Sequence, residues 1–563
     1  MIKRQAQAAR DLIEALVAGG VREAVISPGS RNTPLVLAAD ACPRLRCHVA
    51  IDERVAGFMA LGMSRVSEQP PLLICTSGSA LAHYLPAVLE ATAARLPMIV
   101  LSAARPAELT DCGAPQAWDQ SQVLQPSTRW FRQLPIADEQ GAPVWAVAGT
   151  EALSACWGSP GGVVHVNCPF REPLWEQGLE TQATASPTLL PSVPMPDTRG
   201  LKGRVLDWVG QTGLIVCGPM HGSTADDERL SLAVGRLAQA LQWPIFAEPA
   251  SRLSGRCGKF EMGSLDRLVT SGALKGREPQ VLIQLGTGPT SKRVRHWIAG
   301  LDCEHVTLDR DGLWRDPSMR AQTLIAGDET TTLERWVHDL ESKTAPVDLT
   351  FWRHARAALN SSLSVSGWSE AAVMRSVLKG FEALFVASSL PIRHLEGWIP
   401  AEEHPNVVVS NRGLNGIDGN LATALGAAKA LDQPLLAVIG DVAFVHDLGA
   451  LAQLVADQPN MAIVVIDNAG GGIFRRLPIA AHPEAFDRYF ETAPAINLLE
   501  SARGLGLSAV RVTNTEELES VLPEFVGAST PRVLIAEVSE QADRRWRQTS
   551  ERLYHQLLGE FES

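Results

Sequence analysis

Two polar residues follow two successive apolar runs in the last quarter of the sequence. Asp441 lies two residues after the run 435–439, and Asn468 lies two residues after the run 461–466. Unbroken apolar runs are typical of strands buried on both faces of a parallel sheet, whose carboxyl ends meet at one edge. A carboxylate, an amide oxygen and the backbone carbonyls of glycines 470–472 form a set of hard oxygen ligands that suits Mg²⁺ bound to a diphosphate. The simpler alternative for Asp441 is a helix N-cap, since a helical pattern follows it.

Predicted strands and helices of the kind that would position these residues occur along the whole chain. Short apolar runs alternate with helical patterns, which predicts α/β layers with parallel sheets. At 563 residues the chain is too long for one core. We expect α/β domains at 1–180, 201–345 and 346–563, and a proline-rich linker at 181–200. The expected strands are 24–27, 72–76, 98–102, 163–167, 214–217, 245–248, 281–285, 305–308, 384–387, 407–410, 435–439, 462–466 and 533–538.

Composition and charge narrow the class of protein. The formal net charge of −12 argues against nucleic-acid binding, and it means that an anionic substrate needs a local basic pocket. Nine scattered cysteines without a C-x-x-C pair are typical of reduced thiols, which favours a cytoplasmic protein. The pattern of the N-terminal segment predicts an amphipathic helix that ends at Gly19-Gly20, and not a signal peptide. No apolar run approaches the roughly 20 residues that span a bilayer, so we expect no membrane insertion.

The pairing of Asp441 with Asn468 resembles the diphosphate–metal motif of thiamine diphosphate enzymes. That motif has a glycine after the aspartate and a second asparagine before the metal-binding one, whereas this chain has Val442 and Asp467 at those places. The resemblance implies thiamine diphosphate and Mg²⁺ or Mn²⁺ as cofactors. The residues that it implies at the diphosphate and the metal are Gly440, Asp441, Asn468 and Gly470.

The same resemblance implies a catalytic, cofactor-binding role for Glu53. This residue lies in "IDERVAGFMALG" at an expected strand-to-helix junction, and in such enzymes a carboxylic acid there faces N1′ of the aminopyrimidine. Burial would favour the protonated acid. The alternative is a first-turn glutamate favoured by the helix dipole. Because Glu53 and Asp441 lie in different expected domains, the resemblance also implies a homodimer or a dimer of dimers with active sites across the subunit interface.

Eight segments spread over the chain narrow the resemblance to one family. They are "ISPGSRNTPL", "IDER", "TSGSA", "LSAARPAELTDCGAPQA", "VHVNCPFREPL", "LGTGPTSKR", "SNRGLNGIDG" and "NAGGGIF". Together they resemble the 2-succinyl-5-enolpyruvyl-6-hydroxy-3-cyclohexene-1-carboxylate (SEPHCHC) synthases of menaquinone biosynthesis. The resemblance implies three doubly wound parallel-sheet domains, for pyrimidine binding, a central role and diphosphate binding. It also implies decarboxylation of 2-oxoglutarate and conjugate addition of the succinyl-semialdehyde carbanion to isochorismate.

Basic residues beside the expected strand ends suit two polyanionic substrates. A guanidinium group pairs bidentately with a carboxylate, although any one of these residues alone is more often structural. The resemblance implies that isochorismate is held by Ser30, Arg31, Arg105, Lys292 and Arg293. It places Ser389, Arg393 and Arg412 near the succinyl carboxylate and Gln116 near the reacting carbons. It implies that Ile417 supports the bound cofactor and that the pocket is walled by Ile473, Phe474 and Leu477. For these four apolar residues, core packing is an equal alternative.

Two other functions remain as alternatives. Another thiamine diphosphate 2-oxoacid carboligase or decarboxylase would use the same cofactor motif, but an apolar acceptor would not need Arg105, Lys292 and Arg293. A non-catalytic cofactor-binding scaffold would have the same three domains, but it would have no need of Glu53, Asp441 and Asn468 together.

Overall fold

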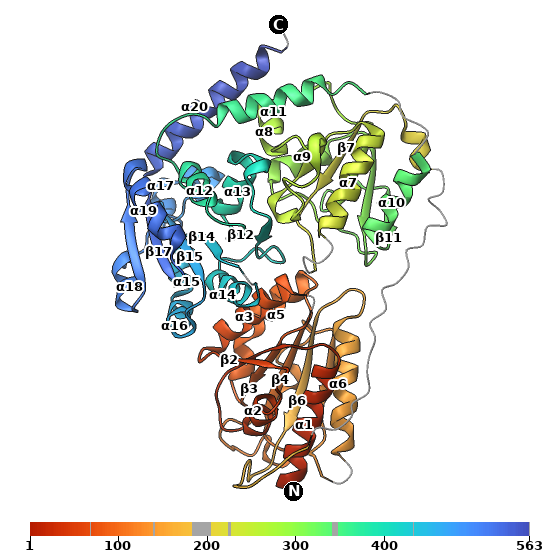
Figure 1. The fold of residues 1–563 in the computed structure, drawn as a ribbon, viewed down its shortest axis with the longest axis vertical. Coiled ribbons are helices and arrows are strands. Elements are labelled where there is room, and N and C mark those ends of the chain that lie inside the picture. The colour runs from red at the N-terminus through yellow and green to blue at the C-terminus, as the bar shows by residue number, and fades with distance from the viewer. Residues whose placement is uncertain are drawn as a thin grey trace.

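The computed structural model describes residues 1–67, 69–138, 141–182, 204–222, 227–340, 347–431 and 433–561. Most of the expected linker 181–200 and the expected boundary at 345 lie outside these residues, and the domain limits stay predictions. Within the described residues, helices surround three parallel β-sheets, one after another along the chain. Figure 1 shows the N-terminal part at the bottom, the central part at the upper right and the C-terminal part at the left. The expected α/β class is confirmed.

The N-terminal sheet has the order β2-β1-β3-β4-β6-β5. Its strands are β1 (Glu23–Ile26), β2 (Arg46–Val49), β3 (Leu72–Cys75), β4 (Met98–Ala104), β5 (Trp130–Gln133) and β6 (Val163–Pro169). Its helices are α1 (Ile2–Ala18), α2 (Thr33–Asp40), α3 (Glu53–Val66), α4 (Ala80–His83), α5 (Leu85–Ala93) and α6 (Pro143–Cys156). The expected amphipathic helix at the N-terminus is α1, whose apolar face packs on α6 and α2.

The central sheet has the order β11-β10-β9-β7-β8. Its strands are β7 (Gly213–Cys217), β8 (Ile245–Ala247), β9 (Val281–Leu285), β10 (Glu304–Asp309) and β11 (Thr323–Ala326). Its helices are α7 (Asp227–Leu241), α8 (Leu265–Ser271), α9 (Lys292–Ala299) and α10 (Glu329–Leu340). No helix among the residues described is long and apolar enough to cross a membrane.

The C-terminal sheet, β13-β12-β14-β15-β17-β16, repeats the strand order of the first sheet. Its strands are β12 (Ala383–Val386), β13 (Val407–Val409), β14 (Leu435–Gly440), β15 (Met461–Asp467), β16 (Ser508–Val512) and β17 (Arg532–Glu537). The helices of this part are α11 (Thr350–Ser362), α12 (Glu370–Leu378), α13 (Leu390–Trp398), α14 (Asn420–Ala430), α15 (Asp441–His446), α16 (Leu448–Asp457), α17 (Pro483–Tyr489), α18 (Leu498–Gly504), α19 (Thr515–Gly527) and α20 (Glu540–Gly559). At the top of Figure 1, α11 packs on α20.

The N-terminal and C-terminal parts share one apolar core, in which α3 crosses α14 (Figure 1). The two helix backbones touch at glycines. A β-carbon added at Gly426 would lie 1.9 Å from Met59 O, and one added at Gly62 would lie 2.0 Å from Thr423 O. No real β-carbon approaches a backbone oxygen so closely, so these glycines set the spacing of the two helices.

Gly426→Ala is therefore expected to destabilise the protein, although alanine is the better helix former by about 1 kcal/mol. Overpacking against a backbone that cannot give way costs on the order of 3 kcal/mol, which corresponds to a melting temperature lower by roughly 6–12 °C. Calorimetry of the purified protein measures this shift. Gly504→Ala at the end of α18 is the control, because its β-carbon would meet no atom within 4 Å. An unchanged melting temperature in Gly426→Ala would contradict the close crossing.

Candidate active site

A cavity opens where the strand order of the C-terminal sheet reverses. The strands β12 and β14 are neighbours, but the strand that follows β12 lies on one side of this pair and the strand that follows β14 lies on the other side. Ligands of open α/β sheets bind at such a point. The cavity has a volume of about 350 Å³, within the size range of small-molecule sites. The expected site residues that line it are Ser389, Arg393, Arg412, Ile417, Gly440, Asp441, Asn468, Ile473 and Phe474.

Asp441 ties the ends of β14 and β15 together. Its Oδ1 accepts a hydrogen bond from Val442 N (2.8 Å) and its Oδ2 accepts one from Gly470 N (2.7 Å). The helix N-cap is Gly440 and not Asp441, so the simpler alternative does not describe this carboxylate. Asp441 is 3% exposed, and burial raises its pKa to about 6. In the part of the chain that the structure describes, no basic side chain forms an ion pair with it, so a buried carboxylate beside an open cavity fits a divalent cation.

The turn after β15 supplies the other expected metal ligands. The Asn468 amide nitrogen donates to Glu370 Oε1 (3.1 Å), and its Oδ1 accepts no hydrogen bond from any residue described. Gly470 and Gly471 have φ of +75° and +58°, and a β-carbon at Gly470 would lie 2.5 Å from Ala493 N. The described residues contain no cluster of three His, Cys, Asp or Glu side chains that could hold a metal. A metal here would combine one carboxylate and one amide with backbone and diphosphate oxygens, so the donors fit.

Guanidinium groups share the cavity with Asp441. Arg393 donates from Nη1 to Ser389 O, and Arg412 donates from Nη2 to Thr290 Oγ1 (3.4 Å). Burial lowers the pKa of both guanidinium groups from the ordinary value for arginine. Ser389 has a φ of +73° at the start of α13, which turns the chain into that helix. The cavity can therefore hold an anionic substrate beside the expected metal.

The central part contributes one cation that sequence reasoning missed. Arg295 on α9 lines the cavity and donates from Nη1 to Pro289 O (2.6 Å) and Thr290 O (3.0 Å). The expected residues Lys292 and Arg293 begin the same helix but are exposed and lie outside the cavity lining. Sequence position alone could not decide which basic residue of "KRVR" faces the C-terminal part.

Two of the expected N-terminal site residues, Arg31 and Arg105, meet at the carboxyl edge of the first sheet. Arg31 donates from Nη1 to Phe170 O (3.0 Å) and from Nη2 to Glu172 Oε1 (2.7 Å). Arg105 Nη1 lies 3.6 Å from the same Glu172 oxygen. Burial, and then the neighbouring charge of Arg105, lower the pKa of Arg31. The two arginines therefore form one cationic pair, as a site for an anion requires.

Ser30, Gln116 and Leu477 lie outside the described lining of the cavity, whereas Phe474 is part of it. Ser30 and Gln116 are exposed, and Gln116 has a φ of +55°. Phe474 lines the cavity and packs edge-on against Phe490, with ring centroids 5.4 Å apart. Leu477 is 45% exposed and is not part of the lining.

Two domain families and several known proteins are similar to this chain. The N-terminal TPP-binding domain of thiamine pyrophosphate enzymes matches residues 6–123, and their C-terminal TPP-binding domain matches residues 396–536. The SEPHCHC synthase of Geobacillus kaustophilus (strain HTA426) is 37% identical over 521 residues, 88% of each chain. SEPHCHC synthases of Myxococcus xanthus and Listeria monocytogenes are each 34% identical, over 92% and 91% of this chain and 92% and 90% of their own. The chain belongs to the SEPHCHC synthase family. The resemblance read from the sequence is confirmed, and the chain is a thiamine diphosphate-dependent enzyme.

In this member of the SEPHCHC synthase family, Glu53 and Asp441 lie in different matched domains. Glu53 lies in the N-terminal TPP-binding domain and Asp441 lies in the C-terminal TPP-binding domain. Glu53 is the first residue of α3, and Asp52 provides the N-cap by accepting from Arg54 N (2.9 Å). The Glu53 side chain forms no hydrogen bond or ion pair with any residue described. Of the described residues that line the cavity, none comes from the N-terminal part. Within one chain, the structure therefore does not bring Glu53 to Asp441.

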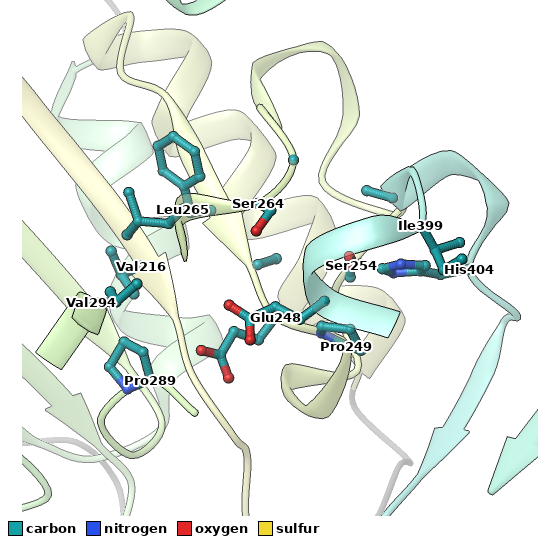
Figure 2. Close-up of a pocket in the computed structure, with 15 residues that line it drawn as sticks. Val216, Glu248, Pro249, Ser254, Ser264, Leu265, Pro289, Val294, Ile399 and His404 are labelled. Carbon is teal, nitrogen blue, oxygen red and sulfur yellow. Dashed lines mark hydrogen bonds between the residues drawn. The ribbon is translucent and has the colours of Figure 1, made fainter. Parts of the chain in front are cut away.

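A second and much smaller cavity lies between the central sheet and α13 (Figure 2). Its volume of about 20 Å³ holds about one water molecule, which excludes a cofactor. Figure 2 shows Glu248 between Pro289 on one side and His404 on the other. Glu248 accepts a hydrogen bond from Thr290 N (2.7 Å), and burial raises its pKa to about 7. Since Thr290 also accepts from Arg412, Glu248 supports the wall of the active-site cavity.

Proposed function

We propose that the chain catalyses the thiamine diphosphate-dependent decarboxylation of 2-oxoglutarate and the addition of the resulting four-carbon unit to isochorismate, giving SEPHCHC and CO₂ for menaquinone biosynthesis. The observation that carries the proposal is the joint presence, in one cavity, of the buried Asp441 carboxylate and three arginines. This arrangement suits a metal–diphosphate group at one place and a dicarboxylic substrate at another. The names of the relatives support the same reaction.

The C-terminal part would hold the cofactor. Asp441, Asn468 and the Gly470 backbone would bind Mg²⁺ or Mn²⁺, and Gly440 would contact the diphosphate. When bound, thiamine diphosphate supplies an electron sink for the loss of CO₂ from a 2-oxo acid. Ile417 and the other apolar residues of the lining would keep water from the reacting atoms.

The arginines would orient the two substrates. Arg393 and Arg412 would pair with the distal carboxylate of 2-oxoglutarate, and such orientation is worth several kcal/mol of barrier. Arg31 and Arg105 would hold a carboxylate of isochorismate in the place of Glu172. The Glu172 side chain is 71% exposed, so its ion pair with Arg31 costs little to exchange.

A second copy of the chain would complete the site. Glu53, Arg31 and Arg105 belong to a sheet edge that contributes nothing to the described lining of the cavity. In a homodimer or a dimer of dimers, this edge of one subunit can face the cavity of its partner, and a symmetric interface then forms two equal sites.

All nine cysteines are free thiols, which supports a reducing compartment such as the cytoplasm.

The experiment that tests the function measures isochorismate consumption and CO₂ release by the purified protein. Thiamine diphosphate, Mg²⁺, 2-oxoglutarate and isochorismate are each omitted in turn, and isochorismate consumption is expected to require the other three. CO₂ release without isochorismate consumption would instead indicate another carboligase or decarboxylase. Absence of both turnover and cofactor binding would indicate a scaffold.

A further inference from the structure

The buried carboxylate of Glu370 lines the same cavity as Asn468 and accepts a hydrogen bond from it. Glu370 is the first residue of α12 and is 5% exposed. Its Oε1 accepts the hydrogen bond from Asn468 Nδ2 (3.1 Å), and its Oε2 lies 2.9 Å from His394 Nε2. His394 is 1% exposed and lies on α13, next in sequence to Arg393. One carboxylate therefore joins the turn after β15 to the helix that carries a substrate-binding arginine.

The chemistry of this contact decides which way the Asn468 amide faces. Glu370 faces the nitrogen of this amide: its Oε1 accepts from Asn468 Nδ2, while its Oε2 lies against His394 Nε2. A carboxylate oxygen is an acceptor, and in an amide side chain only the nitrogen can donate. With the nitrogen engaged, the atom of this side chain left for a metal is Oδ1.

Close packing keeps the Asn468 amide at this place. A β-carbon added at Gly472 would lie 2.6 Å from Asn468 Nδ2 and 3.0 Å from Leu390 Cδ1. At the other end of the contact, the Glu370 backbone nitrogen donates to Asp543 Oδ1 (3.2 Å) on α20. Glu370 is thus held at its carboxylate by α13 and at its backbone by α20.

We propose that Glu370 is a positioning residue, oriented by His394, which turns the Asn468 oxygen toward the bound metal ion. The inference rests on the proposed metal–diphosphate site. Groups that orient a metal ligand in this way set both its geometry and its affinity for the metal, and their loss weakens metal binding about 10–100-fold.

Glu370→Gln tests the proposal, because glutamine keeps the size of the side chain but can present either an acceptor or a donor to Asn468. Free Mn²⁺ is measured by electron paramagnetic resonance during titration of the full-length protein with thiamine diphosphate present. The affinity for Mn²⁺ is expected to fall about 10–100-fold, and kcat is expected to recover at saturating Mn²⁺. Damage to the fold alone would not be reversed by metal.

Glu540→Gln is the matched control. Glu540 also follows a serine N-cap as the first residue of a helix, but its carboxylate accepts from Arg544 on the surface. Its Mn²⁺ affinity is expected to equal that of the wild type. If the wild type binds Mn²⁺ and Glu370→Gln matches it within about twofold, the positioning role is overturned. If the wild type binds no Mn²⁺ with thiamine diphosphate, the proposed metal site itself fails.

His394→Gln provides a second variant that leaves Glu370 in place. It removes the imidazole that holds the carboxylate, so the Mn²⁺ affinity is expected to fall in the same direction by a smaller factor. Combined with Glu370→Gln, it is expected to add almost nothing, because both residues act through one contact. Additive losses in the double variant would overturn the role of His394.

Discussion

Asp441→Asn is expected to lower kcat/KM by at least about 10³-fold, equivalent to roughly 4 kcal/mol of lost transition-state stabilisation. Asp441 is the buried carboxylate at the proposed metal position, and its Oδ2 accepts the Gly470 N–H that shapes the turn. An amide removes the charge and, in one orientation, places a donor against that N–H. Turnover with thiamine diphosphate and Mg²⁺, together with cofactor binding by calorimetry, measures the effect.

Asp467→Asn is the informative control for this prediction. Asp467 lies at the end of the adjacent strand, and its carboxylate accepts only from Ala469 N (3.2 Å) in the structure described. The change also restores the asparagine of the general thiamine diphosphate motif, so near-wild-type activity is expected. Retention of more than about a tenth of wild-type activity by Asp441→Asn would contradict the metal assignment.

Glu53→Gln is expected to lower kcat about 10²–10³-fold while the fold survives. The carboxyl group would serve the aminopyrimidine of the cofactor, whereas its own chain gives it no hydrogen bond or ion pair among the residues described. The helix start is capped by Asp52, so the substitution removes little stability. Turnover and the melting temperature are measured together, and Glu516→Gln in the first turn of α19 is the control. Activity close to the wild type would rule out this role for Glu53.

Mixed oligomers extend the same experiment to the subunit interface. When Glu53→Gln and Asp441→Asn subunits are unfolded together and reassembled, a site formed across subunits leaves one intact site in each mixed dimer. Random pairing then restores up to about one quarter of wild-type activity. Sites formed within single chains would stay inactive at every mixing ratio.

The sequence predicted the inner strands of all three sheets but not four edge strands. Inner strands such as β14 and β15 are buried on both faces, so their residues are apolar almost throughout. The missed strands are β2, β5, β11 and β16, each at the edge of its sheet and partly exposed. An edge strand needs no continuous apolar run, so its sequence resembles that of a loop.

The sequence by itself also determined the chemistry at the strand ends. In a parallel sheet, residues that follow adjacent strands must meet at one edge, so Asp441 and Asn468 could be paired from their positions after two apolar runs. Strand positions alone could not assign roles to Arg31 and Arg105, because a lone arginine after a strand has many structural uses. Their roles were predicted from the family resemblance.

Only the tertiary structure decided which residues from other elements join that edge. Arg295 faces the cavity while Lys292 and Arg293 do not, because the packing of the central part selects one side of α9. Glu370 reaches Asn468 across 98 residues of sequence, and as a first-turn glutamate it looks like any residue that favours a helix start. Such contacts depend on how helices and strands from distant parts of the sequence pack together, and no local pattern of apolar and polar residues predicts that packing.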